Sequence, residues 1–378
     1  MKFLHTADWH LGKLIHGVYM TEDQSEILEQ FVELADRIKP DAIIIAGDLY
    51  DRSVPPAEAV NLLNETLYKL NVDMKIPVVA ISGNHDSADR IAFGSAWYKH
   101  SDLHVTGKWS PVLKGVEIKG VRFHSVPYAE PSVIRETLKD DSITSHHDAM
   151  KQVVASISSL EDFGEKPEVL VGHSFVTGGS TTDSERTLSV GGAGTVGKEL
   201  FDSFTYTALG HLHSPYAIRD EKVHYSGSLM KYSFSEANHK KMVKCVTIEN
   251  QEVSVEEILL KPKRDMVILR GSLEELMKQD FYDRKEDYIK AVLTDEGALI
   301  DPINRLRSVY PNVLHLERES TERDKKRDRQ VREKHENLSD TELFRRFFAY
   351  VTEAEWTEEL EAELKESLNV SLKGSDES

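Results

Sequence analysis

Residues 42–51 have the sequence AIIIAGDLYD, which places an uninterrupted apolar run directly before a glycine and two aspartates. A run of this length predicts a fully buried strand of a parallel sheet. Gly47 would let the backbone turn sharply after the strand, so that Asp48 stands at the strand end. The rigid sheet behind this turn would hold the Asp48 side chain in a fixed position.

The same pattern recurs at four other places in the chain. Each has a short apolar run followed by Asp, Asn or His side chains: Asp8-Trp9-His10, Gly83-Asn84-His85-Asp86, Gly172-His173 and Gly210-His211-Leu212-His213. Turn residues that cap strands would explain the glycines and Asp51. They would not explain why histidine returns at one strand end after another. The five segments therefore predict one polar site that the fold assembles from distant parts of the chain.

The spacing within these segments predicts which side chains face the site. In an extended backbone, residues two apart point to the same side. We therefore expect Asp8 and His10 to face one point, and His211 and His213 likewise. The glycines that precede the other ligands are expected to allow the same sharp turn as Gly47; they are Gly83, Gly172 and Gly210.

The side-chain chemistry of the set predicts a pair of divalent ions. The set offers carboxylate, amide oxygen and imidazole groups and no thiolate, which suits manganese or iron, with zinc and magnesium as less specific alternatives. Two ions need a bridging ligand, and Asp48 is the best candidate because the strand order places it centrally. Ion pairs of this kind assist the cleavage of phosphate esters by making water a better nucleophile.

Three further residues are assigned by their place beside these ligands. His85 follows Asn84 directly, so its side chain is expected to point away from the ions. That position suits contact with the phosphate or protonation of the leaving oxygen. Asp51 and Asp86 are expected to hydrogen-bond the metal ligands.

The composition indicates a globular protein of a reducing compartment. Hydrophobic residues make up 39% of the 378 residues and charged residues 30%. The single cysteine, Cys245, excludes an intrachain disulfide. We find no apolar run as long as a membrane span and no signal peptide, so we expect a cytoplasmic protein without a membrane partner. The net charge of −18 argues against bulk attraction to nucleic acid but allows a local binding site.

Strand and helix patterns alternate through the first part of the chain. Apolar stripes with helical spacing at residues 24–38 and 57–70 separate strands expected at residues 2–6, 42–46 and 77–81. Such units imply parallel strand pairing with helices over the sheet face. Further on we expect a helix at residues 149–160 and strands within residues 112–126 and at 168–171, 205–209, 217–218, 223–226, 243–248 and 253–258. The sum predicts a large αβ domain with two sheets over residues 1–260.

The remaining residues are expected to form three smaller parts. Residues 261–319 show a strand–helix–strand–helix–strand pattern, and residues 320–335 form a basic linker. Residues 336–378 contain twelve acidic and four basic residues, so this tail carries much of the net charge. Two helices are expected in the tail, at residues 342–351 and 354–368. Their aromatic side chains need a partner surface because a helical hairpin cannot bury them alone; they are Phe347, Phe348 and Tyr350.

The motif set resembles that of the calcineurin-like metallophosphoesterases, and within them the SbcD family, the nuclease subunits of bacterial SbcCD complexes. The matching residues are 6–12, 46–51, 82–86, 210–213 and 225–228. The resemblance implies a two-sheet αββα core with a capping domain at residues 261–319. It also implies one ion bound by Asp8, His10, Asp48 and His213, a second bound by Asp48, Asn84, His173 and His211, and an assisting role in phosphate-ester cleavage for His85.

The resemblance further implies a manganese-dependent DNA nuclease that cuts double-stranded ends and single strands in DNA end processing, repair and recombination. Its partners would be DNA and the SbcC ATPase, which the tail would bind, in a heterotetramer that contains a nuclease homodimer. The dimer surface would lie near residues 61–68 and 91–98. The polar segment at residues 177–197 would be either a DNA-contacting loop or a plain surface loop.

Two alternative functions stay open. A small-molecule or protein phosphoesterase would use the same metal centre, although it would need neither the capping domain nor the tail. A non-catalytic adaptor would keep the fold for binding alone. The complete ligand set, together with His85, argues against an adaptor.

Overall fold

The computed structural model describes residues 1–112, 115–185, 194–278 and 280–319, together with a few positions between residues 344 and 364. The chain divides into two units, Met1–Glu317 and Arg318–Ser378. The expected linker at residues 320–335 and most of the two expected tail helices lie outside the described residues. Among the described residues, no helix has the length and apolar character that a membrane span requires.

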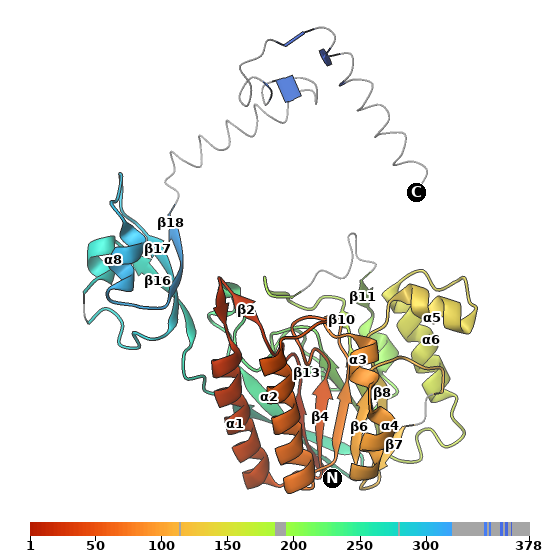
Figure 1. The fold of residues 1–378 in the computed structure, drawn as a ribbon. Helices are drawn as coiled ribbons and strands as arrows, with labels where there is room; N and C mark the ends of the chain where they lie inside the picture. The colour runs from red at the N-terminus through yellow and green to blue at the C-terminus, as the bar shows by residue number, and fades with distance from the viewer. Residues whose placement is uncertain are drawn as a thin grey trace. The chain divides into compact units, whose positions relative to one another are not determined.

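A six-stranded sheet forms one half of the first unit (Figure 1). Its strand order is β15-β14-β1-β4-β5-β6, and the four strands from β1 to β6 run parallel. The apolar runs before three of the motifs form its centre, where both faces of a strand are buried. The bounds are β1 (Lys2–Thr6), β4 (Ala42–Ala46), β5 (Val78–Ile81), β6 (Leu103–Thr106), β14 (Met242–Glu249) and β15 (Glu252–Leu259).

A five-stranded sheet packs face to face with the first. Its order is β13-β12-β9-β8-β7, with only β7 antiparallel to its neighbour. Between the sheets, the ring of Phe3 lies edge-on to the rings of Phe123 and Tyr206, with ring centres 5.5 and 5.6 Å away. The bounds are β7 (Val116–Ile118), β8 (Val121–Val126), β9 (Glu168–His173), β12 (Tyr206–Gly210) and β13 (Val223–Tyr225).

Helices cover the outer face of each sheet, so this part of the unit has four layers (Figure 1). Phe31 of α1 (Thr21–Ile38) and Leu63 of α2 (Ala57–Leu67) pack on the first sheet. Met150 and Ile157 of α6 (His146–Ser158) pack on the second sheet beside α5 (Pro131–Leu138). The predicted αββα fold class is confirmed.

Several short elements differ from the sequence expectation. The helix expected at residues 57–70 ends at Leu67 and continues as the π-helix η1 (Tyr68–Asp73). The strand expected at residues 217–218 is wrong, because Ala217 N donates to Ser214 O and the chain turns there. Elements too short to show a periodic pattern were missed: β2 (Leu14–Ile15), β3 (Val18–Tyr19), α3 (Ala88–Ala92), α4 (Ser95–Tyr98), η2 (Lys99–Ser101), β10 (Phe175–Val176), β11 (Thr195–Val196), η4 (Lys198–Phe201) and η5 (Phe234–Glu236).

A small separate sheet, β16-β17-β18, has its own apolar core in the region expected as a capping domain. Arg264 and Tyr288 anchor this region to α1. The Arg264 guanidinium makes two 2.9 Å contacts with the Asp23 carboxylate, and the Tyr288 hydroxyl donates to the same group at 2.7 Å. The domain boundary near residue 260 stays a prediction. The elements are β16 (Met266–Gly271), α7 (Leu273–Leu276), β17 (Tyr288–Leu293), α8 (Pro302–Arg307) and β18 (Val313–Arg318).

Candidate metal centre

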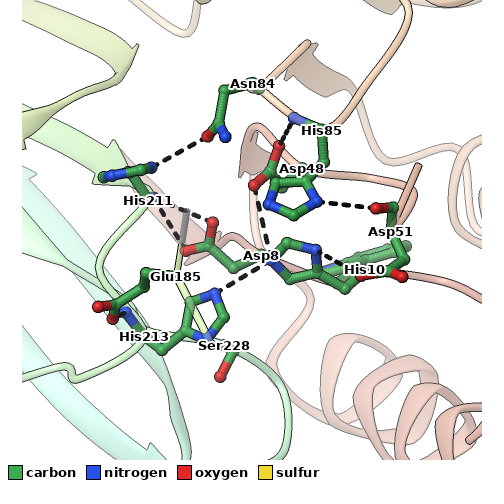
Figure 2. Close-up of polar contacts among 12 residues, drawn as sticks. Asp8, His10, Asp48, Asp51, Asn84, His85, Glu185, His211, His213 and Ser228 are labelled. Carbon is green, nitrogen blue, oxygen red and sulfur yellow. Dashed lines mark hydrogen bonds and ion pairs between the residues drawn. The ribbon is translucent and has the colours of Figure 1, made fainter. Parts of the chain in front are cut away.

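The five predicted segments meet at one place because they follow strands whose carboxyl ends face the same way. β1, β4 and β5 are parallel in the first sheet, and β9 and β12 are parallel in the second. Figure 2 shows side chains from these segments pointing toward one another, among them Asp8, Asp48, Asn84 and His211. All the expected ligands are buried except Asn84, which is partly exposed. The structure therefore brings the seven expected ligands together.

Close contacts with neighbouring atoms, rather than turning alone, explain the glycines. Of the four, only Gly47 has a left-handed backbone, with φ of +91°. A Cβ on Gly210 would lie 2.0 Å from Ala46 O, and a Cβ on Gly83 would lie 2.2 Å from Asp48 Oδ1. A side chain at Gly210 would force the two sheets apart, and one at Gly83 would displace Asp48. The backbone at Gly83, Gly172 and Gly210 is not left-handed, so the freedom of glycine to adopt that conformation is not what these three positions require.

The backbone at the first motif is not extended, so two-residue alternation is not the reason that Asp8 and His10 face the site. Asp8, His10 and Asp48 have φ values of 52°, 45° and 50°. This left-handed region costs about 1 kcal/mol or more for a residue with a Cβ. Asp8 N donates to Gly47 O at 3.0 Å and Gln24 Nε2 donates to His10 O at 2.8 Å, which holds the loop in place. Sequence reasoning missed Gln24, which reads as an ordinary helix residue.

One group of ligands gathers around His10. Its Nε2 atom lies 3.0 Å from His213 Nε2 and 3.5 Å from Asp48 Oδ2. The Asp8 carboxylate is oriented by the backbone N–H of His211, which it accepts at 3.0 and 3.1 Å. Ligand atoms of Asp8, His10 and His213 all lie within 4.8 Å of one another. Three such atoms from buried groups can hold one cation.

A second group gathers around Asn84. Its Oδ1 atom lies 3.0 Å from both His173 Nε2 and His211 Nδ1. His173 Nδ1 lies 2.9 Å from Ala46 O, and because a carbonyl only accepts, this nitrogen carries the proton. His173 Nε2 therefore faces Asn84 and also Asp48 Oδ2, at 3.4 Å. The Asp48 carboxylate thus lies between the two groups, where a bridging ligand would stand.

Burial and mutual charge set the protonation of the site. Burial raises the pKa of Asp8 to about 7 and lowers the pKa of His10 and of His211 well below the usual histidine value. Burial also opposes ionisation of Asp48, yet the charges of His173 and His10 hold its pKa well below the usual range. At His173 the attraction of Asp48 outweighs burial and raises the pKa to about 9. Buried carboxylates and neutral imidazoles suit a divalent cation, because the positive charge of the cation balances the negative charge of the carboxylates.

His85 packs beside the first group of ligands. Its backbone N–H donates to Asp48 Oδ1 at 2.8 Å, and its Nδ1 atom lies 2.7 Å from the backbone carbonyl of Asp51. The His85 ring is 4.6 Å from the His10 ring and nearly perpendicular to it. With its Nδ1 proton donated to the carbonyl, His85 has Nε2 as the nitrogen for proton exchange.

The two flanking aspartates act differently from each other. The Asp51 carboxylate lies 2.7 Å from Lys13 Nζ and 3.6 Å from His10 Nδ1, so it stands behind an expected ligand. Asp86 contacts no ligand side chain. It accepts the backbone N–H groups of Leu49, Tyr50 and Gly83 at 2.9–3.0 Å and so ties the two ligand loops together. Burial, helped by the charge of Asp48, raises the pKa of Asp86 to about 7.

Sequence reasoning missed a polar cluster behind His213. Ser184, Glu185, Glu236 and Lys241 all contact His213. They come from loops and from the short helix η5, in which no periodic pattern marks a buried residue. The sequence signals near them were the motif at residues 225–228 and the polar segment at residues 177–197, which contains Ser184 and Glu185.

Comparisons with known proteins assign the family. Residues 1–215 match the family model for calcineurin-like phosphoesterases. The chain belongs to this family. Residues 262–352 match the SbcD_C model, described as the Type 5 capsule protein repressor C-terminal domain. The predictions of this family and of a phosphodiester-hydrolysing enzyme are confirmed. Membership of the family implies divalent metal ions, for which the structure offers candidate ligands.

A curated relative narrows the assignment within the phosphoesterases. The SbcD subunit of the nuclease SbcCD from Staphylococcus epidermidis is 39% identical over 318 residues, which cover 84% of this chain and 85% of the relative. The chain therefore belongs to the SbcD family. A dimetal phosphatase from Danio rerio is 12% identical with a TM-score of 0.43, and covers 68% of this chain and 96% of its own. The protein TT1561 of Thermus thermophilus is 13% identical with a TM-score of 0.37, at 68% and 98% coverage.

Replacing Asp86 should destabilise the protein even without metal. Asp86→Ala removes the acceptor of three backbone N–H groups, and we expect the free energy of unfolding to fall by about 3 kcal/mol or more, because each orphaned donor costs about 1–3 kcal/mol when buried. Urea unfolding of the metal-free protein measures this loss. Asp140→Ala, which removes a partly exposed carboxylate that accepts hydrogen bonds from Ser142, is the control. Equal unfolding midpoints for the wild type and Asp86→Ala would show that the contacts do not matter.

Proposed function

We propose that this chain is a manganese-dependent DNA nuclease that cuts double-stranded ends and single strands. The observation that carries the proposal is the place of the Asp48 carboxylate between two groups of nitrogen and oxygen ligands. The name of the Staphylococcus epidermidis relative, which makes it part of the nuclease SbcCD, supports nucleic acid as the substrate. The proposal includes roles in DNA end processing, repair and recombination, and a cytoplasmic location.

Two manganese ions would be held by the expected ligands, with magnesium or another divalent ion as a substitute. Bound ions supply positive charge to the phosphate and make water a stronger nucleophile. Manganese suits a set of imidazole and oxygen ligands without thiolate. One ion would be bound by Asp8, His10, Asp48 and His213, and the other by Asp48, Asn84, His173 and His211.

His85 would exchange a proton with the substrate through Nε2. Its Nδ1 proton is committed to the Asp51 carbonyl, so the ring orientation is fixed while Nε2 serves the leaving oxygen or a phosphate oxygen. Asp51, through His10, and Asp86, through the ligand-loop backbones, would act as positioning residues.

A small-molecule or protein phosphoesterase is the second candidate. The metal centre alone does not separate the two, since both hydrolyse phosphate esters. The additional sheet at residues 266–318, fixed to α1 through Asp23, favours a large substrate that a capping domain can help to present. We assign residues 1–260 to the nuclease domain and residues 261–319 to this capping domain.

Two substitutions separate metal binding from proton transfer. Asp48→Ala should abolish cleavage of end-labelled duplex DNA and reduce bound manganese, because it removes the bridging carboxylate. His85→Ala should keep both ions while lowering the exonuclease rate by about 100-fold or more, the usual effect of losing a general acid. His104→Ala, a histidine of β6 outside the site, is the control. A normal cleavage rate for His85→Ala would refute its assignment, and cleavage of only a chromogenic phosphodiester by the wild type would favour the second candidate.

The tail at residues 336–378 would bind the SbcC ATPase, joined through the basic linker at residues 320–335. Among its described positions, the rings of Phe344 and Phe348 lie 6.1 and 5.3 Å from the ring of Trp356. Phe344 is still 44% exposed, so this aromatic group offers apolar surface to a partner.

Deleting residues 336–378 should abolish capture of SbcC while manganese binding is kept. The reason is that the metal ligands all lie in the first unit. Pull-down of SbcC with the tagged chain measures the loss, and deletion of residues 370–378 alone is the control. Unchanged capture by the longer deletion would rule out the tail as the docking element.

A homodimer within an SbcC-containing heterotetramer completes the proposal. An apolar groove of about 800 Å³ lies between α2 with η1 on one side and α3 with α4 on the other. Phe93 and Trp97 on its rim are 71% and 69% exposed. The groove coincides with the two segments expected at the dimer surface, and a two-fold pair of copies would cover the same patch on each.

Placing a charge in this groove should convert the dimer to a monomer. Trp97→Glu would bury an unpaired carboxylate in an apolar interface, which is strongly unfavourable. Light scattering after size-exclusion chromatography measures the mass. Ile300→Glu changes a residue that is 86% exposed in the small β16-β17-β18 region and should leave the mass unchanged. If Trp97→Glu still forms a dimer with wild-type affinity, the interface lies elsewhere.

A further inference from the structure

A chain of buried and partly buried polar groups holds the imidazole of His213 on the side away from His10. Ser184 Oγ lies 2.6 Å from His213 Nδ1 and 2.5 Å from Glu236 Oε1. Glu236 is 0% exposed and His213 only 1%. His213 Nε2, the other ring nitrogen, faces His10 Nε2.

The direction of these hydrogen bonds follows from the charge of Glu236. Its Oε2 atom lies 2.5 Å from the Lys241 ammonium, so Glu236 is an ionised carboxylate that can only accept. Ser184 must therefore donate its hydroxyl proton to Glu236. The Ser184 oxygen is then an acceptor for the Nδ1 proton of His213, which leaves the Nε2 lone pair facing His10.

Lys241 fixes the backbone of His213 as well. Besides Glu236, its Nζ atom donates to His213 O and to Ser228 Oγ, each at 2.8 Å, so all three ammonium protons are used. The backbone N–H of His213 donates to Glu185 Oε1 at 2.6 Å. The ring, the carbonyl and the amide of His213 are thus each held by a different side chain.

Stability alone does not account for this arrangement. A buried ion pair such as Glu236 with Lys241 adds little net stability, because removing two charges from water costs about as much as their attraction returns. A histidine that binds a metal commonly donates its second ring proton to an acceptor that fixes its tautomer, and loss of that acceptor weakens metal binding by about 10–100-fold.

We propose that Ser184, Glu236 and Lys241 act as positioning residues that fix the Nδ1-protonated form of His213 and so set the affinity of one of the two ion sites. The inference rests on the proposed metal centre and extends it to residues outside the motifs. The segment at residues 177–197 was expected to be a DNA-contacting loop or a plain surface loop. The inference gives Ser184, within that segment, a different role. Residues 186–193 of the same segment lie outside the described part of the chain.

The other ion site provides an internal comparison. His173 is oriented by a backbone carbonyl, Ala46 O, which no side-chain substitution removes. Changes at Ser184 or Glu236 should therefore weaken the site that contains His213 and leave the site that contains His173 intact. Loss of one site in the presence of the other is a result that general unfolding would not produce.

The test is manganese binding to the full chain, measured by calorimetry and by electron paramagnetic resonance, which distinguishes a coupled pair of ions from an isolated one. Ser184→Ala and Glu236→Gln should bind one ion with near wild-type affinity and the other about 10–100-fold more weakly. Their spectra at limiting manganese should show the isolated ion. Ser184→Thr, which keeps the hydroxyl, should restore the coupled pair.

A matched control is Glu168→Gln, which changes the first residue of β9, the strand that ends at His173. Glu168 is also buried and lies 2.7 Å from a histidine, His124, but it is about 17 Å along the strand from His173, at roughly 3.3 Å per residue. It should lower the unfolding midpoint without changing either manganese affinity. Wild-type affinities in Ser184→Ala, or the same affinity loss in Glu168→Gln, would overturn the inference. A wild-type chain that binds no manganese would instead overturn the proposed function.

Discussion

The site depends on the close approach of the two sheets at the carboxyl ends of their strands. The end of β12 passes so near to β4 that any side chain at Gly210 would overlap Ala46 O. This contact brings ligands from the second sheet within reach of ligands from the first. Neither sheet holds a complete set by itself, since Asp48 and Asn84 belong to one and His173 and His211 to the other. The fold is thus a means of bringing two half-sites together.

The ligands are held by contacts that are themselves buried. The backbone at Asp8, His10 and Asp48 is in an unfavourable conformation. It persists because Gln24 binds the first loop and Asp86 binds the second and third. Because several contacts hold these loops, the side chains need to move little when an ion or substrate binds. Charges that are already in place are usually the largest contribution to catalysis.

The sequence predicted the parts of this arrangement that depend on local pattern. The strand at residues 42–46 is uniformly apolar and bounded by turn residues, so its place and burial could be inferred directly. The candidate ligands could be inferred because an apolar run followed by Asp, Asn or His recurs at five places in the chain. The extended geometry assumed for Asp8 and His10 was wrong because the true backbone is imposed by hydrogen bonds from Gly47 and Gln24, which are distant in sequence. Glu236 and Lys241 could not be found because a three-residue helix and the loop after it are too short to show a periodic sign of burial.

The central claim is that seven side chains from five strand ends hold two cations with Asp48 between them. Anomalous scattering from crystals grown with manganese tests it most directly. The account predicts two manganese peaks, one beside His10 and His213 and the other beside Asn84 and His173, with the Asp48 carboxylate in contact with both. A single peak, or peaks with Asp48 outside the contact distance of either, would contradict it.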